Sequence, residues 1–259
     1  MASAPGISGL PMLYNDLVPL SSQEHANWRV RPLQSLNLIA NVHAVPITVD
    51  EFPVAQRSFP IVFSSGPDSV PLALMGLNEG VNVFVKPDGS FPENTYLPAF
   101  IRRYPFLLAR LQENSDDLSL CFDPSSGMLG DFEDGVRLFD GAEPEQPVKD
   151  MLGFCEQFEH AAQRTSAFMK DLLETDLLED AEFTIQHPSS EQPYVYRGFR
   201  MVNEQKLRDL RGDQLRKMSQ NGMLPLLYAH LFSMSLTSDI FARQFEQGKI
   251  PVPQVNPGA

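Results

Sequence analysis

Three adjacent residues, Arg102, Arg103 and Tyr104, carry side chains that could bind a charged ligand. Two neighbouring guanidinium groups can hold a carboxylate or a phosphate through bidentate hydrogen bonds. The same groups can instead neutralise the negative end of a short helix or pair with nearby acids, which are abundant here. Both interpretations stay open, so Arg102, Arg103 and Tyr104 are candidate ligand-binding residues.

Two of the five scattered histidines, His43 and His230, are further candidate ligand-binding residues. No histidine lies in an HExxH motif or at metal-ligand spacing from a cysteine. A site made of Cys121, His43 and an aspartate would need folding to bring these distant residues together. His230 lies in an apolar segment, where a hydrogen-bonded structural histidine is the usual case. The sequence also lacks a nucleophile elbow, a Walker loop and a GxGxxG motif. The sequence therefore predicts no catalytic residue, metal site or cofactor, although missing motifs weigh only weakly against an enzyme.

The sequence indicates a cytoplasmic protein. Its two cysteines, Cys121 and Cys155, cannot make a disulfide framework, which fits a reducing compartment. The first twenty residues contain no basic residue and no continuous apolar block, so we expect no cleaved export signal. No apolar run approaches the roughly 18 residues that a membrane span needs.

Charge is distributed unevenly along the chain. The net charge is −13, and residues 113–182 contain 19 acidic residues against 4 basic ones, so the whole negative excess lies in the middle. Binding to nucleic acid requires the neutralisation of phosphates by basic groups, which this balance disfavours. We therefore expect no nucleic-acid partner.

The hydrophobic pattern predicts an α+β fold with a mixed, mainly antiparallel sheet, covered by a long central helix and a C-terminal helical segment. Residues 70–111 are the centre of this organisation, because Pro98 suits a helix start and Pro105 ends that helix. The main predicted strands are Pro60–Phe63, Pro71–Leu77, Val83–Val85, Phe106–Leu111, Leu118–Asp123, Phe183–Gln186 and Tyr194–Val202. The main predicted helices are residues 98–103, 147–173 and 223–247, with Asn203 and Asp213 as N-caps of two shorter ones.

The helix predicted from Pro147 has the clearest amphipathic pattern. Its apolar residues alternate at spacings of four and three and form one stripe from Met151 to Leu172. Such a stripe can cover a sheet of its own domain, or it can dimerise or dock a partner. Both interpretations stay open. For the whole chain we expect a partly ordered arm over residues 1–24, a single domain over residues 25–247 and a flexible tail over residues 248–259.

Three blocks of this sequence resemble the SapC family of bacterial proteins. They are Leu10–Asn15 with Leu17–Leu20, then Leu74–Leu77 and Val83–Val85 with Arg102–Phe106, and finally Leu227–Leu231. The resemblance runs from about residue 10 to about residue 245 and implies one family domain. The family is named from surface-layer loci, which implies a role in envelope or surface-layer biology. It implies no reaction and no catalytic residue.

The resemblance, the missing motifs and the helical stripe together predict an accessory protein rather than an enzyme. We expect it to bind a protein or peptide partner in envelope, surface-layer or uptake-related processes, or to self-associate through the Met151–Leu172 stripe. Two alternatives stay open. One is an enzyme acting on a small molecule or peptide near Arg102, Arg103 and Tyr104, and the other is a structural surface-layer component.

Overall fold

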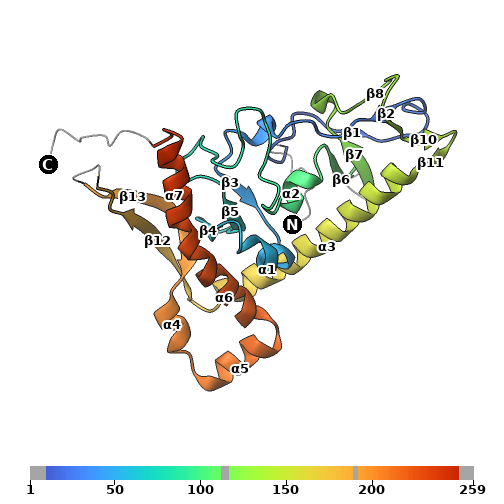
Figure 1. Ribbon diagram of the computed structural model, residues 1–259. Helices are drawn as coiled ribbons and strands as arrows, with labels where there is room; N and C mark the ends of the chain where they lie inside the picture. The colour runs from blue at the N-terminus through green and yellow to red at the C-terminus, as the bar shows by residue number, and fades with distance from the viewer. Residues whose placement is uncertain (1–9, 112–116, 189–191, 251–259) are drawn as a thin grey trace. The chain divides into compact units, whose positions relative to one another are not determined.

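The computed structural model describes residues 10–111, 117–188 and 192–250 of the chain (Figure 1). The fold is α+β, and the chain divides into two compact units, each built from two separate stretches. The first unit contains Met1–Leu38 and Ala99–Arg164, and the second contains Ile39–Pro98 and Thr165–Ala259. No helix among the described residues is long and apolar enough to cross a membrane.

The first unit is centred on an antiparallel sheet with strand order β1-β7-β6. The predicted hairpin is confirmed, because β6 (Phe106–Arg110) pairs with β7 (Leu118–Phe122), and part of the predicted connection lies outside the described residues. Short helix α2 (Ala99–Arg102) precedes it, bounded by the two predicted prolines. The remaining short elements are β1 (Val18–Pro19), β2 (Arg29–Val30), η1 (Asn37–Ile39, which crosses into the second unit), η3 (Pro124–Ser126), β8 (Leu129–Gly130), β9 (Val136–Arg137), β10 (Phe139–Asp140) and β11 (Glu143–Pro144).

The second unit is built on a five-stranded sheet with strand order β12-β13-β4-β5-β3, in which every neighbouring pair is antiparallel. Its strands are β3 (Ala44–Pro46), β4 (Ile61–Ser64), β5 (Pro71–Leu74), β12 (Leu178–Ile185) and β13 (Tyr194–Val202). Its helices are η2 (Val49–Glu51), α1 (Phe52–Ala55), α4 (Glu204–Arg208), α5 (Gly212–Gln220), α6 (Met223–Ser233), η4 (Met234–Leu236) and α7 (Thr237–Glu246). Helix α6 packs against β4, β13 and α1.

The long predicted helix is confirmed as α3 (Gln146–Leu173), which belongs to the first unit up to Arg164 and to the second from there on. In the first unit, Cys155 of its apolar stripe joins a core cluster with residues of β6 and β7. In the second unit, Thr165 Oγ1 accepts a hydrogen bond from Val49 N at 3.0 Å, and the Phe168 ring packs 6.0 Å from Phe52. Most of the stripe is therefore buried within the chain, so it offers no continuous exposed seam to a second copy.

The predicted strand at Val83–Val85 is wrong, although its side chains are buried. The side chain of Asn82 accepts hydrogen bonds from Phe84 N at 2.8 Å and Val85 N at 3.2 Å, so these amides do not pair with a neighbouring strand. Gly76 is required close by, because a Cβ there would lie 1.9 Å from the carbonyl oxygen of Val81.

Three helix details also differ from the sequence prediction. Asn203 caps α4 as expected, but the cap of α5 is Arg211, and Asp213 lies inside the first turn. The C-terminal helix is interrupted by η4, where Ser233 and Thr237 hydroxyls donate to the carbonyl oxygens of His230 and Met234. Beyond this break, Phe245 is 41% exposed rather than inward-facing.

In the predicted N-terminal arm, Tyr14 is buried in the first unit, whereas Leu10 and Met12 are exposed. Residues 1–9 and 251–259 lie outside the described residues. A single domain over residues 25–247 stays a prediction.

Candidate functional site

Arg103, one of the predicted ligand-binding residues, lies in the core of the first unit. It is 1% exposed, and its guanidinium carbon lies 4.1 Å from the ring centre of Phe158 and 4.8 Å from that of Phe100. Its Nη1 is 3.8 Å from Oε1 of the buried Glu159. Aromatic faces and a carboxylate together compensate the loss of water around the guanidinium group. The group stabilises this core and has almost no surface to offer a ligand.

Tyr104 and the neighbouring Tyr14 are also held by core contacts. The Tyr14 hydroxyl donates a 2.7 Å hydrogen bond to the Phe106 carbonyl oxygen, and the two tyrosine rings pack edge to face at 5.3 Å. Burial raises the pKa of both phenols, the nearby Asp123 carboxylate raises that of Tyr104 further, and a hydrogen bond with Ser125 opposes the change. Both phenols therefore stay protonated at neutral pH.

Arg102 is exposed, and its guanidinium carbon lies 5.0 Å from the ring centre of Phe154 on α3. The two adjacent arginines thus occupy different environments, one at the surface and one in the core. They do not form the shared clamp that their adjacency in the sequence allows.

His230 is fully buried in the second unit and joins two strands to α6. Its Nδ1 donates to the carbonyl oxygen of Ile61 in β4 at 2.6 Å, and its Nε2 accepts from Val202 N in β13 at 3.1 Å. Burial lowers the pKa of His230 to about 4, against the effect of the hydrogen bond to Ile61. These partners define the neutral tautomer with the proton on Nδ1, so His230 is a structural histidine.

His43 lies immediately before β3, where its carbonyl oxygen accepts hydrogen bonds from Met75 N and Gly76 N at 2.7 and 3.1 Å. In the sheet, β5 separates β3 from β4, to which His230 is bonded, so the structure does not bring the two histidines together. The predicted partner Cys121 belongs to the first unit and His43 to the second. Burial raises the pKa of the Cys121 thiol to about 11 and that of Cys155 to about 12, which leaves both in the unreactive thiol form.

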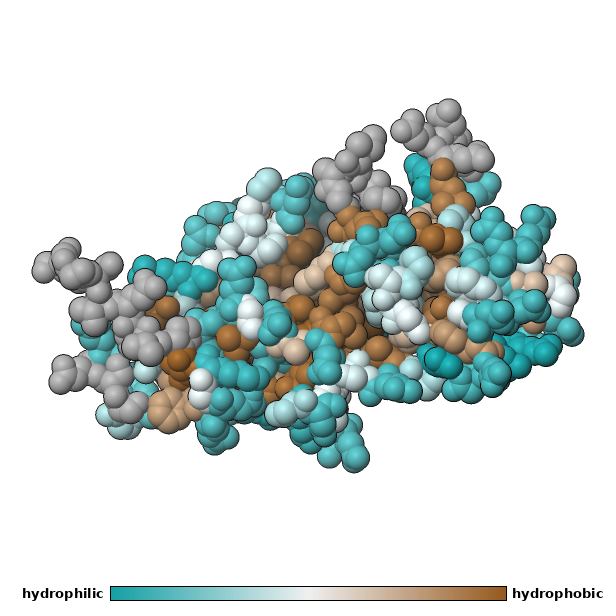
Figure 2. Space-filling model, turned by 90° about the horizontal axis from the view of Figure 1, so that it is seen from above, coloured by the Kyte–Doolittle hydropathy of each residue, from teal (hydrophilic) through white to brown (hydrophobic). Residues whose placement is uncertain are grey.

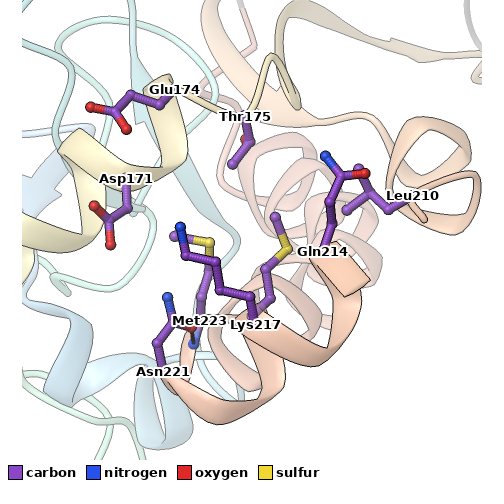
Figure 3. Close-up of a pocket in the computed structure, with 9 residues that line it drawn as sticks. Asp171, Glu174, Thr175, Leu210, Gln214, Lys217, Asn221 and Met223 are labelled. Carbon is purple, nitrogen blue, oxygen red and sulfur yellow. Dashed lines mark hydrogen bonds between the residues drawn. The ribbon is translucent and has the colours of Figure 1, made fainter. Parts of the chain in front are cut away.

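A cavity of about 250 Å³ lies in the second unit, between the end of α3, helix α5 and the start of α6 (Figure 3). Asp171 and Glu174 project from the end of α3, and Lys217 extends toward them from α5 (Figure 3). The lining is completed by Thr175, Leu210, Gln214, Met218, Asn221 and Met223. Within the described part of the chain, no ion pair or hydrogen bond engages the carboxylates of Asp171 and Glu174 or the ammonium group of Lys217.

A second, wider hollow of about 610 Å³ lies beside the β12–β13 hairpin of the same unit. Glu182 and Arg197, which line it, form an ion pair with 2.7 Å between Nε and Oε2. Glu182 and Arg197 thus neutralise each other, whereas Asp171, Glu174 and Lys217 in the cavity at α5 form no ion pair among the described residues. In the described residues, no group of three His, Cys, Asp or Glu side chains is arranged to hold a metal ion.

Sequence reasoning did not find the cavity at α5, because its lining comes from three segments without a common motif. One local signal was available: Asp171 and Glu174 come at the end of a long helix, where the helix dipole favours basic residues. Acidic side chains at that position are unfavourable unless a positive group lies close to them. They are therefore candidates for binding a cationic group.

The family model described as SapC matches residues 20–240, which is most of the chain. Searches of curated proteins and of solved structures found no match. The matched region contains the Arg102–Phe106 block together with the helix of His230 and reaches α7. The chain therefore belongs to the SapC family.

Proposed function

We propose that this protein is a non-catalytic accessory protein that binds a protein partner in envelope, surface-layer or uptake-related processes, and that it works in the cytoplasm. The family membership supports the process, and the two cysteines, which are free buried thiols, fit the reducing cytoplasm. His230 is engaged in two hydrogen bonds within the fold and Tyr104 packs in the core, which favours binding over a reaction at these groups.

The exposed side of α6 is the observation that carries the proposal. Phe232 is 68% exposed and stacks on Tyr228, itself 38% exposed, with 5.8 Å between ring centres. Helix α6 contains no Asp, Glu, Lys or Arg, and the adjacent α1 adds the exposed Val54. The face drawn in Figure 2, which is seen from above, also shows hydrophobic residues among hydrophilic ones. Exposed aromatic side chains of this kind are typical anchors of protein interfaces.

The partner surface that fits this side of α6 is apolar and uncharged at its centre. An uncharged helix face cannot hold a phosphate backbone, and the net charge of −13 repels one. A protein that inserts an aliphatic or aromatic side chain beside Phe232 would remove the rings of Phe232 and Tyr228 from water. This burial is favourable by about 25 cal/mol per Å² of apolar surface.

The test is affinity capture from native lysate with quantitative mass spectrometry, comparing wild type with Phe232→Ser. The matched control is Val136→Ser, because Val136 is 56% exposed on β9 in the other unit. We expect a specific protein that wild type and the control retain and that Phe232→Ser loses. Identical protein sets from all three, or no retained protein at all, would refute the proposal.

Cell fractionation separates this function from that of a structural surface-layer component. We expect the protein in the cytoplasmic fraction. Recovery with the outer surface would replace the proposal with the structural alternative.

A further inference from the structure

The cavity at α5 has one acidic wall. Asp171 lies in the last turn of α3 and Glu174 directly follows the helix, so both carboxylates lie at its negative end. The nearby Asp176 differs, because its carboxylate pairs with Lys206 Nζ at 3.4 Å. The fold therefore provides a cation for the acid outside the cavity and, among the described residues, none within ion-pair distance of the two acids that line it.

The opposite wall presents hydrogen-bond donors. Asn221 Oδ1 accepts from Met223 N at 3.1 Å, and Gln214 Oε1 accepts from Arg211 N at 3.2 Å, so each amide oxygen is already bonded. The NH₂ groups of both amides remain as donors, and the ammonium group of Lys217 lines the same cavity. One wall can thus accept hydrogen bonds from a cation, and the other can donate them to an anion.

The floor between the walls is apolar. Met218 and Met223 are buried, and Leu210 adds a half-buried aliphatic side chain. Methionine side chains adapt to ligands of different shape. The volume of about 250 Å³ lies below the roughly 300–1,000 Å³ of pockets that take drug-sized ligands, so the occupant is smaller.

We propose that this cavity binds a small zwitterion with an apolar side chain, namely a free amino acid or a dipeptide. Its ammonium group contacts Asp171 and Glu174, its carboxylate contacts Lys217 and the Asn221 amide, and its side chain lies on the two methionines. This site is separate from the exposed side of α6, so the inference does not depend on the proposed protein partner.

Isothermal titration calorimetry on the full chain tests the proposal with four probes. Leucine and glycyl-leucine carry both charges, leucinamide lacks the carboxylate, and N-acetyl-leucine lacks the ammonium group. We expect one or both zwitterions to bind with a dissociation constant below about 10 mM, and both single-charge probes to bind at least about tenfold more weakly. Whichever of leucine and glycyl-leucine binds more tightly shows whether the ligand is a free amino acid or a dipeptide.

Two variants assign the contacts. Lys217→Gln should weaken the preferred zwitterion about tenfold while leaving leucinamide unchanged, and Glu174→Gln should weaken the zwitterion while leaving N-acetyl-leucine unchanged. The control is Lys170→Gln, which lies next to Asp171 on α3 but does not line the cavity. Unfolding curves in urea establish that each variant is folded. No binding of either zwitterion by wild type, equal binding of all four probes, or unchanged zwitterion binding by Lys217→Gln would overturn the proposal.

Discussion

The Arg103–Glu159 pair in the first unit and the Asp171, Glu174 and Lys217 group in the second differ in their access to water. The first pair is buried among aromatic rings, with side-chain exposures of 2% and 6%. The second group lines an open cavity and makes no ion pair within the described residues. A buried charge whose neighbours compensate it serves the fold, whereas an exposed charge at an unfavourable position is available for binding.

The largest effect is expected when the buried pair is broken. Arg103→Met should lower the free energy of unfolding by about 3–5 kcal/mol, because it removes the buried guanidinium group that lies 3.8 Å from the buried Glu159 carboxylate. The neighbouring Arg102→Met should cost no more than about 1 kcal/mol, since the Arg102 side chain is exposed and its charge is screened by water. Urea unfolding followed by circular dichroism measures both.

A double variant separates the lost charge pair from lost packing. Arg103→Met with Glu159→Leu removes both charges and should recover most of the loss. Equal losses from Arg102→Met and Arg103→Met, or a double variant less stable than Arg103→Met, would contradict the role assigned to this pair.

An intermediate effect is expected from His230 in the second unit. Its pKa is about 4 in the folded protein and near the ordinary 6.5 in the unfolded chain, so the unfolded chain binds more protons between these values. The free energy of unfolding should therefore fall as the pH is lowered through this window, by on the order of 2 kcal/mol between pH 7.5 and pH 5. Below about pH 4 this contribution is already lost.

His230→Gln supplies the comparison for that pH dependence. We expect the variant to be less stable than wild type at every pH, because glutamine cannot reproduce both hydrogen bonds of His230. Glutamine does not titrate, however. The variant should lose less stability than wild type between pH 7.5 and pH 5. Parallel pH profiles of the two proteins would show that His230 is not the titrating group.

The smallest effect on stability is expected at the cavity. Lys217→Gln should change the free energy of unfolding by less than about 0.5 kcal/mol, because no ion pair or hydrogen bond of its side chain is lost among the described residues. Glu174→Gln should be neutral or slightly stabilising, since it removes a negative charge at the negative end of α3. If either variant lowered the free energy of unfolding by more than about 2 kcal/mol, its charged group would stabilise the fold, as the Arg103–Glu159 pair does.

Local sequence signals predicted the elements that depend on neighbouring residues. Apolar segments joined by polar connections located both hairpins, and Pro98 and Pro105 bounded α2. The errors came from side chains that bond to the backbone. Asn82 takes the amides of Phe84 and Val85 away from a sheet, and the Ser233 and Thr237 hydroxyls accompany a break in the C-terminal helix. Alternating patterns of apolar residues carry no information about such bonds.

The candidate site was harder to predict, because side-chain type does not reveal burial. The adjacent arginines looked like one binding motif, yet only Arg102 reaches the surface. His230 was recognisable as a structural residue from its apolar neighbours. The cavity at α5 combines the end of α3 with residues 210–223, and only the tertiary fold brings these segments together.

The comparison of the two charged groups is tested most directly by unfolding in urea with and without glycyl-leucine, or leucine if calorimetry shows that it binds better. We expect the ligand to raise the unfolding midpoint of wild type and of Arg102→Gln, and to raise that of Lys217→Gln much less, because this variant binds about tenfold more weakly. At about ten times the dissociation constant the gain is about 1.4 kcal/mol. A full gain in Lys217→Gln that disappears in Arg102→Gln would instead place the binding site at the adjacent arginines.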